Sequence, residues 1–171
     1  MSILPLTGWL FLLIFLQATV FNHIHLLGYA TPLPYFYFLM KLPVDSSRVT
    51  YIVCGFCLGL AIDVFSNTPG MTAASLCAMG LITPVLLKFF LPADHEEENF
   101  SPSMHSMGKS AFLLFTLTLS TLHCSLFFTI ESFSFLDWQT LLCKIGSSAL
   151  LTFICVAGLE TVSTPHKHRV E

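Results

Sequence analysis

The sequence predicts an all-α integral membrane protein, a single bundle of six or, in a second arrangement, five transmembrane helices. Of its 171 residues, 54% are hydrophobic and only 10% are charged, and the mean hydropathy is +0.78. Soluble domains carry about a quarter charged residues, so this composition excludes an ordinary soluble protein. No polar segment is long enough for a second domain, and no basic stripe indicates binding to nucleic acid.

Six apolar segments separated by polar links define the expected spans. About twenty apolar residues in a helix suffice to cross the hydrocarbon core of a bilayer. The expected spans are residues 4–21, 28–42, 49–65, 69–91, 107–130 and 139–159. The second span differs from the others because Pro32 and Pro34 free backbone groups that neighbouring helices or water must satisfy. It predicts either a kinked short span or a partly re-entrant segment.

Two polar segments lie outside the spans, and the basic residues set the orientation. Residues 92–106 form an acidic loop and residues 160–171 a short tail, and both are predicted to be cytoplasmic. With six spans and the N-terminus inside, six of the seven lysine and arginine residues fall on the cytoplasmic side, as the positive-inside rule expects. These six are Lys41, Arg48, Lys88, Lys109, Lys167 and Arg169, and the exception is Lys144. If the second segment does not cross, only the N-terminus changes side.

The third span carries two glycines and one carboxylate on a single face. Gly55, Gly59 and Asp63 are spaced four residues apart, which aligns them along a helix. Glycines at this spacing let another helix approach closely in lipid. An ionisable residue inside an apolar span indicates a functional site by default. We therefore expect this face to pack a helix of this chain or of a partner.

A turn at residues 66–70 leads into the fourth span. Thr68 suits the N-cap position of that helix, and Pro69 suits its first helical position. Ala74 and Ala78 would then give the fourth helix a face of small residues.

Four ionisable groups from three spans are expected to converge near the outer end of the bundle. His123 and Glu131 share one face of the fifth span, Lys144 lies two turns into the sixth, and Asp63 lies at a similar depth. Three roles remain open for this outer polar cluster. It could be architectural, with Lys144 neutralising a carboxylate or with Asp63 accepting hydrogen bonds from the N–H groups that open the fourth helix. It could instead bind a partner, or move protons or ions.

The sequence contains none of the common catalytic motifs. There is no H-E-x-x-H, no G-x-S-x-G and no P-loop. The six cysteines all fall in apolar stretches, where free cysteine behaves as a small hydrophobe. We therefore expect no catalytic residues, no metal and no cofactor.

The residues around Asp63 resemble a family signature. The stretch G-L-A-I-D-V-F-S-N-T-P-G-M-T-A-A-S-L, residues 59–76, is similar to the signature of the rod shape-determining protein MreD family. Gly59, Asp63 and Gly70 occupy the motif positions. Residues 20–35, 42–48 and 127–135 also resemble members of this family.

This resemblance implies a non-enzymatic scaffold in the bacterial inner membrane, with five or six helices arranged like the S component of energy-coupling vitamin transporters. Its implied role is in the elongation complex that directs lateral peptidoglycan synthesis and rod shape. The implied partners are the bitopic protein MreC, the synthase RodA with its class B transpeptidase, and MreB filaments. A second interpretation is a substrate-binding transporter subunit for a small vitamin-like molecule, because a kinked second segment and an outer polar cluster suit a pocket open to the periplasm.

Overall fold

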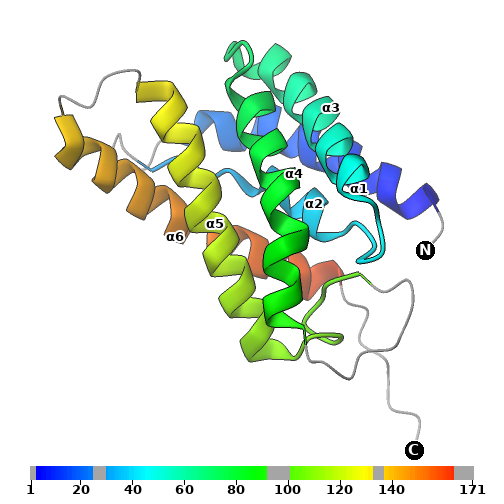
Figure 1. Ribbon diagram of the computed structural model, residues 1–171. Helices are drawn as coiled ribbons and strands as arrows, with labels where there is room; N and C mark the ends of the chain where they lie inside the picture. The colour runs from blue at the N-terminus through cyan, green and yellow to red at the C-terminus, as the bar shows by residue number, and fades with distance from the viewer. Residues whose placement is uncertain (1–2, 25–29, 92–100, 133–136, 164–171) are drawn as a thin grey trace, which may run out of the picture.

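The computed structural model shows a bundle of α-helices (Figure 1). It describes residues 3–24, 30–91, 101–132 and 137–163, and no β-strand occurs among them. The helices are α1 Ile3–Thr19, α2 Tyr37–Met40, α3 Arg48–Ser66, α4 Met71–Phe90, α5 Lys109–Ser132 and α6 Trp138–Ser163. Two 3₁₀ turns, Phe21–His23 and Pro34–Phe36, complete the described elements.

Four helices, α3 to α6, are long and apolar enough to cross a membrane, so the chain is a multi-pass membrane protein. They overlie the expected spans with ends shifted by four residues or fewer. Helix α1 has 17 residues, about 26 Å at 1.5 Å per residue, and is shorter than the four. We name the two ends of the bundle after residues of α3. The Arg48 end also holds the end of α4 and the start of α5, and the Ser66 end holds the α3–α4 turn (Figure 1).

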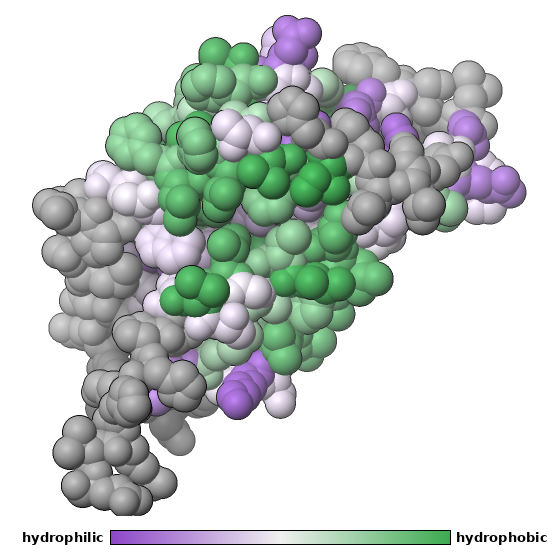
Figure 2. Space-filling model, turned by 180° about the vertical axis from the view of Figure 1, so that it is seen from behind, coloured by the Kyte–Doolittle hydropathy of each residue, from purple (hydrophilic) through white to green (hydrophobic). Residues whose placement is uncertain are grey.

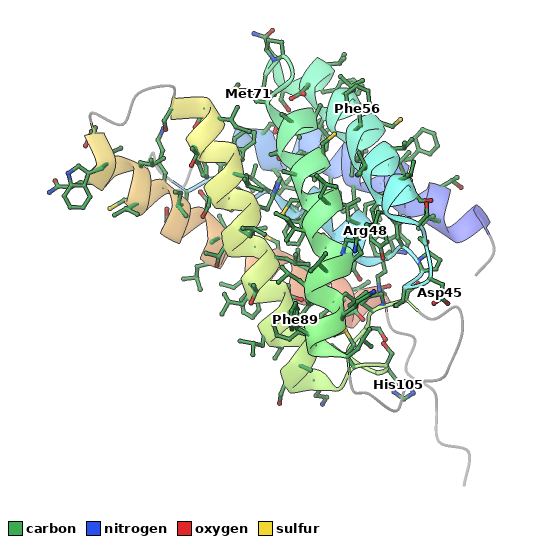
Figure 3. All side chains as sticks on the ribbon, viewed as in Figure 1. Asp45, Arg48, Phe56, Met71, Phe89 and His105 are labelled. Atoms are coloured by element: carbon green, nitrogen blue, oxygen red, sulfur yellow. The ribbon has the colours of Figure 1, made fainter. Side chains whose placement is uncertain are left out.

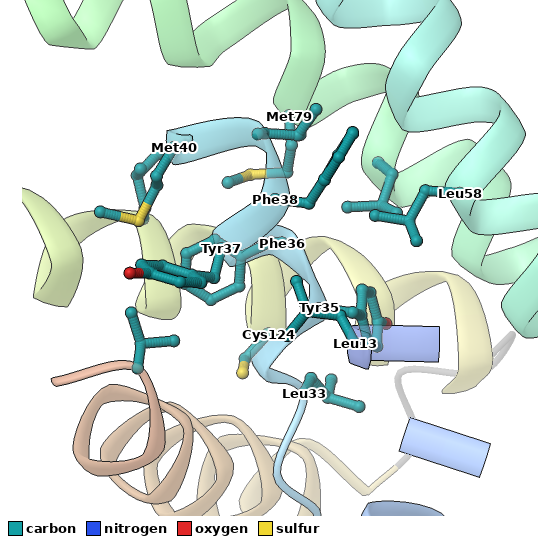
Figure 4. Close-up of a cluster of buried hydrophobic side chains, with 14 of the residues drawn as sticks. Leu13, Leu33, Tyr35, Phe36, Tyr37, Phe38, Met40, Leu58, Met79 and Cys124 are labelled. Atoms are coloured by element: carbon teal, nitrogen blue, oxygen red, sulfur yellow. The ribbon is translucent and has the colours of Figure 1, made fainter. Parts of the chain in front are cut away.

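The segment expected to form the second span is not a transmembrane helix. Among its described residues only Pro34–Phe36 and Tyr37–Met40 are helical; residues 30–33 before them are not helical, and Lys41 ends the short helix in a turn. Its side chains from Pro32 to Leu42 are buried, and Figure 4 shows this segment passing between the surrounding helices. We refer to residues 30–42 as the crossing segment, because its contacts advance along α6 from Ser148 to Glu160.

Hydroxyl groups of α6 explain how irregular backbone is tolerated at this depth. The N–H of Thr31 donates to Ser148 Oγ at 3.0 Å, and the N–H of Leu33 donates to Thr152 Oγ1 at 2.9 Å. The intervening Pro32 and the following proline at position 34 have no N–H to satisfy. Non-helical backbone within a membrane protein is stable only where it is surrounded by protein and its polar groups are paired. Of the two predicted forms, the kinked transmembrane helix is wrong because only residues 34–40 are helical, although a neighbouring helix does satisfy the backbone as expected. The partly re-entrant form stays a prediction.

Helices α3 and α4 form the closest pair in the bundle, and glycines make this possible. A Cβ atom on Gly59 would lie 2.4 Å from Ala73 Cα, and one on Gly55 would lie 2.7 Å from the carbonyl oxygen of Leu76. Gly80 of α4 lies equally close to α3, since a Cβ atom there would lie 2.8 Å from the carbonyl oxygen of Tyr51. The glycine face thus packs a helix of this chain. The prediction that Ala74 helps to form a small-residue packing face on α4 is wrong, because Ala74 is exposed and Ala73 and Gly80 contact α3 instead.

The surface is apolar over the middle of the bundle and polar toward its ends. Figure 2 shows hydrophobic side chains gathered across one face, with hydrophilic residues toward its edges. In Figure 3, Phe56 and Phe89 lie on the outside of α3 and α4, whereas Asp45, Arg48 and His105 lie at the Arg48 end. The exposed apolar side chains of α3 to α6 fit contact with lipid.

The two ends of the bundle differ in charge. Arg48, Lys88 and Lys109 all lie at helix ends that meet at the Arg48 end. Lys144 instead lies in the second turn of α6, toward the opposite end. Asp137 directly precedes α6 and accepts hydrogen bonds from both the hydroxyl and the N–H of Thr140, in the first turn of that helix. These bonds hold the pKa of the Asp137 carboxyl below its usual range.

Candidate functional site

Asp63 caps helix α4 from across the turn. Its side chain is 5% exposed and accepts three hydrogen bonds. The Thr68 hydroxyl donates to Oδ1 at 2.8 Å, the Thr72 N–H donates to Oδ1 at 2.9 Å, and the Ala73 N–H donates to Oδ2 at 3.0 Å. Of the roles left open by the sequence, the structure shows the one in which Asp63 satisfies the N–H groups that open the fourth helix.

Gly70 makes this external cap necessary. Helix α4 begins after Gly70, whose φ of 80° lies in the left-handed region and whose lack of a side chain leaves the helix without its own cap. Thr72 and Ala73 are the second and third helical residues, the positions whose N–H groups a cap normally satisfies. The prediction of Thr68 as N-cap and Pro69 as first helical residue is therefore wrong. Thr68 belongs to the turn and bonds to Asp63 instead.

Substitution of Asp63 tests this capping role. We expect Asp63→Ala to lower the free energy of unfolding by about 3 kcal/mol, because two buried N–H groups and a hydroxyl lose a charged acceptor. Asp63→Asn should lose less, because the amide oxygen still accepts one bond. Reversible unfolding of the purified protein in mixed micelles, followed by circular dichroism, measures both. An equal loss in Asp45→Ala, which changes an exposed loop carboxylate, would contradict the assignment.

The expected outer polar cluster is only partly brought together. Lys144 Nζ lies 3.9 Å from Glu131 Oε2, and both side chains are partly exposed. No salt bridge links Lys144 to Asp63 among the described residues. A pair of this exposure stabilises a protein by about 0–1 kcal/mol. Glu131 and Lys144 therefore mark the Ser66 end with a weak surface ion pair.

His123 does not join that pair, because it is fully buried among aromatic rings. Its ring centroid lies 5.1 Å from that of Tyr35 in an edge-to-face arrangement and 5.4 Å from that of Phe36. Neither ring nitrogen has a hydrogen-bond partner among the described residues. His123 and Glu131 lie eight residues apart on α5, the spacing from which they were expected to share a face. The crossing segment packs over His123, however, whereas Glu131 stays exposed near the Ser66 end.

A second buried ionic site lies at the Arg48 end. Lys41 Nζ donates to Glu160 Oε2 at 2.7 Å, and the Tyr37 hydroxyl donates to the same oxygen. The Met104 N–H donates to Glu160 Oε1 at 3.2 Å, and Lys41 Nζ lies 4.9 Å from the centre of the Tyr37 ring. These contacts tie α6 to the crossing segment and to the loop before α5.

Sequence reasoning missed this site for a physical reason. Lys41 was expected only as one of the basic residues on the cytoplasmic side, but its side chain is buried at 7% exposure, and Glu160 is 0% exposed. The two residues are 119 positions apart, so no local spacing relates them. Glu160 was predicted to lie in the polar tail, which is wrong, because α6 continues to Ser163 and buries this residue. The available signal was that a long apolar run ends directly before Glu160, where a carboxylate that joins the helix needs a partner.

A cavity of about 310 Å³ lies at the Ser66 end, between α1, the crossing segment and the ends of α3 and α5. Its polar wall includes Gln17, Asn22, Ser66 and Glu131. Its apolar wall includes the aromatic side chains of Tyr35, Phe65, Phe127 and Phe128. Ligand pockets typically measure about 300–1,000 Å³, so this cavity has the size of a small one.

Among the described residues, no group of three His, Cys, Asp or Glu side chains could hold a metal ion. All six cysteines are free, with Cys124 buried and Cys57 and Cys143 exposed. No family model, curated protein or solved structure matches the chain. Its own residues therefore carry the functional inference.

Proposed function

We propose that the chain is a non-enzymatic membrane scaffold of a rod-shape complex, which helps to position lateral peptidoglycan synthesis. The observation that carries this proposal is the stretch from Gly59 to Leu76, which resembles the MreD signature. In the structure this stretch forms the α3–α4 hairpin. Gly59 allows the two helices to approach closely, and the Asp63 carboxylate accepts hydrogen bonds from the first turn of α4. Its motif residues are thus used to build a rigid hairpin, as a scaffold requires.

The hairpin leaves its other face for partners. Since Gly55 and Gly59 pack against α4, they do not contact a partner helix, and the outward face of α3 is the available surface. Val53, Phe56, Leu60 and Val64 follow this face at helical spacing and are between 42% and 78% exposed. We propose this face for a bitopic, MreC-like transmembrane helix. RodA with its class B transpeptidase, and MreB filaments, are the further proposed partners.

The charge asymmetry supports an orientation in the bacterial inner membrane. The Arg48 end carries Arg48, Lys88 and Lys109 at its helix ends, and such an excess favours the cytoplasmic side. The proposed orientation therefore places this end and the C-terminus in the cytoplasm. The cavity at the Ser66 end would then face the periplasm.

Depletion in the native host tests the shape role. We expect depleted rod cells to become round and wild-type protein to restore them. A Phe56→Ala/Leu60→Ala variant should insert and fold but restore shape poorly and co-purify less of the bitopic partner. The matched control, Val85→Ala/Phe89→Ala on the outward face of α4, should behave as wild type. Cells that keep their rod shape after depletion, in a host with one copy of the gene, would refute the shape role.

A second candidate function is favoured by the cavity at the Ser66 end. A substrate-binding transporter subunit for a vitamin-like molecule would need a pocket open to the outside, lined by apolar and polar groups. The cavity has this composition and lies near the lower limit of size for such a ligand. A vitamin-like molecule that co-purifies with the chain would favour this function over the scaffold.

A further inference from the structure

We propose that the cavity at the Ser66 end binds a small uncharged or singly cationic molecule that carries N–H donors and a flat apolar part. The proposal stands independently of the shape role, because it depends only on the chemistry of the cavity wall. Three observations carry it: the size of the cavity, a buried acceptor without a donor, and the sign of the charge at its rim.

The size and the wall set the shape of the ligand. A water molecule occupies about 30 Å³ in the liquid, so 310 Å³ corresponds to about ten waters, or an organic ligand on the order of ten non-hydrogen atoms. Tyr35, Phe127 and Phe128 contribute ring surface to the wall, and Phe127 and Phe128 meet edge to face with ring centroids 5.4 Å apart. Aromatic walls of this kind favour a flat apolar group.

Gln17 supplies the unsatisfied acceptor. Its side chain is 1% exposed, and its Nε2 atom donates to Asn22 Oδ1 at 2.9 Å and to the carbonyl oxygen of Pro32 at 3.4 Å. Both amide hydrogens are thus committed, and Oε1 has no donor among the described residues. The Tyr35 hydroxyl likewise has no partner of ordinary hydrogen-bond geometry there. Oε1 itself has almost no accessible surface on the cavity, so the Gln17 amide must rotate to present it. Because a buried unpaired acceptor costs free energy, a ligand N–H that bonds to the rotated amide would be favoured.

The charge on the cavity wall disfavours an anionic ligand. Among the described residues of the wall, Glu131 is the one formally charged residue, and none is a lysine or arginine. Lys144 lies 3.9 Å from Glu131 but does not line the cavity, so the carboxylate is the charged group nearest a bound ligand. An anion would be repelled by this carboxylate and would find no cationic partner in the wall, whereas a cation would be attracted to the rim.

Matched pairs of small probes test the proposal on the purified full chain in detergent micelles. Nicotinamide and tryptamine provide the donors, and nicotinate and indole-3-acetate are their anionic counterparts of similar shape. Binding is read by calorimetric titration and by the shift in unfolding temperature. We expect both donors to bind and raise the unfolding temperature, and both anions to bind at least tenfold more weakly.

Two variants locate the site. Gln17→Leu should weaken both donors about tenfold, and Glu131→Gln at the exposed rim should weaken tryptamine severalfold while leaving nicotinamide unchanged. Thr121→Ala on the exposed face of α5 is the control and should bind as wild type.

Three results would overturn the proposal: no binding of either donor at millimolar concentration, equal binding of donors and anions, or tryptamine affinity unchanged in Glu131→Gln. If Gln17→Leu does not fold, the affinity of Glu131→Gln for tryptamine still tests the proposal. None of these results bears on cell shape, so a failed ligand site and a failed scaffold role are distinguishable.

Discussion

Replacing Glu160 with alanine should lower the free energy of unfolding by about 3–5 kcal/mol, because it leaves the Lys41 ammonium buried without its counter-ion. Glu160 is fully buried, and its carboxylate accepts hydrogen bonds from Lys41, Tyr37 and the backbone of Met104. The substitution therefore removes one charge and leaves three donors without their acceptor, two in the crossing segment and one in the loop before α5. We expect the end of α6 to detach from the crossing segment first.

A double-mutant cycle separates the ion pair from the packing around it. Lys41→Met should also be strongly destabilising, whereas the Lys41→Met/Glu160→Met double variant should lose less than the sum of the two single changes. Reversible unfolding in mixed micelles, followed by circular dichroism, gives the free energies. Glu131→Ala is the matched control, since its pair with Lys144 is partly exposed and is worth about 0–1 kcal/mol. Similar losses at Glu131 and Glu160 would contradict the assignment.

The two buried carboxylates, Asp63 and Glu160, differ in how far the sequence alone could predict their roles. Long apolar runs specify α3 to α6 because the hydrophobicity and length of a membrane helix are local properties. The cap on α4 was open to prediction for the same reason, since Asp63 lies only nine residues before Thr72. The ion pair at the Arg48 end was not, because it joins residues 119 positions apart and depends on the path of the crossing segment.

The path of the crossing segment has a signal in the sequence, but that signal can be interpreted only together with two hydroxyl groups of α6. In residues 31–34, each N–H-bearing residue is followed by a proline, so only alternate positions need an acceptor. Ser148 and Thr152, one helical turn apart on α6, supply those acceptors. Proline alone therefore predicted an interrupted helix. The prediction of buried, non-helical backbone required knowledge of the two hydroxyls, which the sequence does not pair with these N–H groups.

The close approach of α3 to α4 leads to the second large effect, in which Gly59→Ala should destabilise the protein by about 2–3 kcal/mol. A Cβ atom there would lie 2.4 Å from Ala73 Cα and 2.7 Å from the Ala73 nitrogen, and backbone cannot move aside as a flexible side chain can. The same nitrogen donates to Asp63, so separating the helices also weakens the cap. Gly59→Leu should be worse while still inserting, because its hydropathy suits the membrane.

The same substitution elsewhere in the chain provides the control. Gly146 is an exposed residue of α6, and nothing lies within 4 Å of a Cβ atom built there. Gly146→Ala should therefore be neutral or stabilising by up to about 1 kcal/mol, since alanine favours the helix. Opposite signs for Gly59→Ala and Gly146→Ala in one unfolding assay would establish that the motif glycine acts through helix contact within this chain. If Gly59→Ala leaves stability unchanged but reduces recovery of a partner, the glycine face must instead contact that partner.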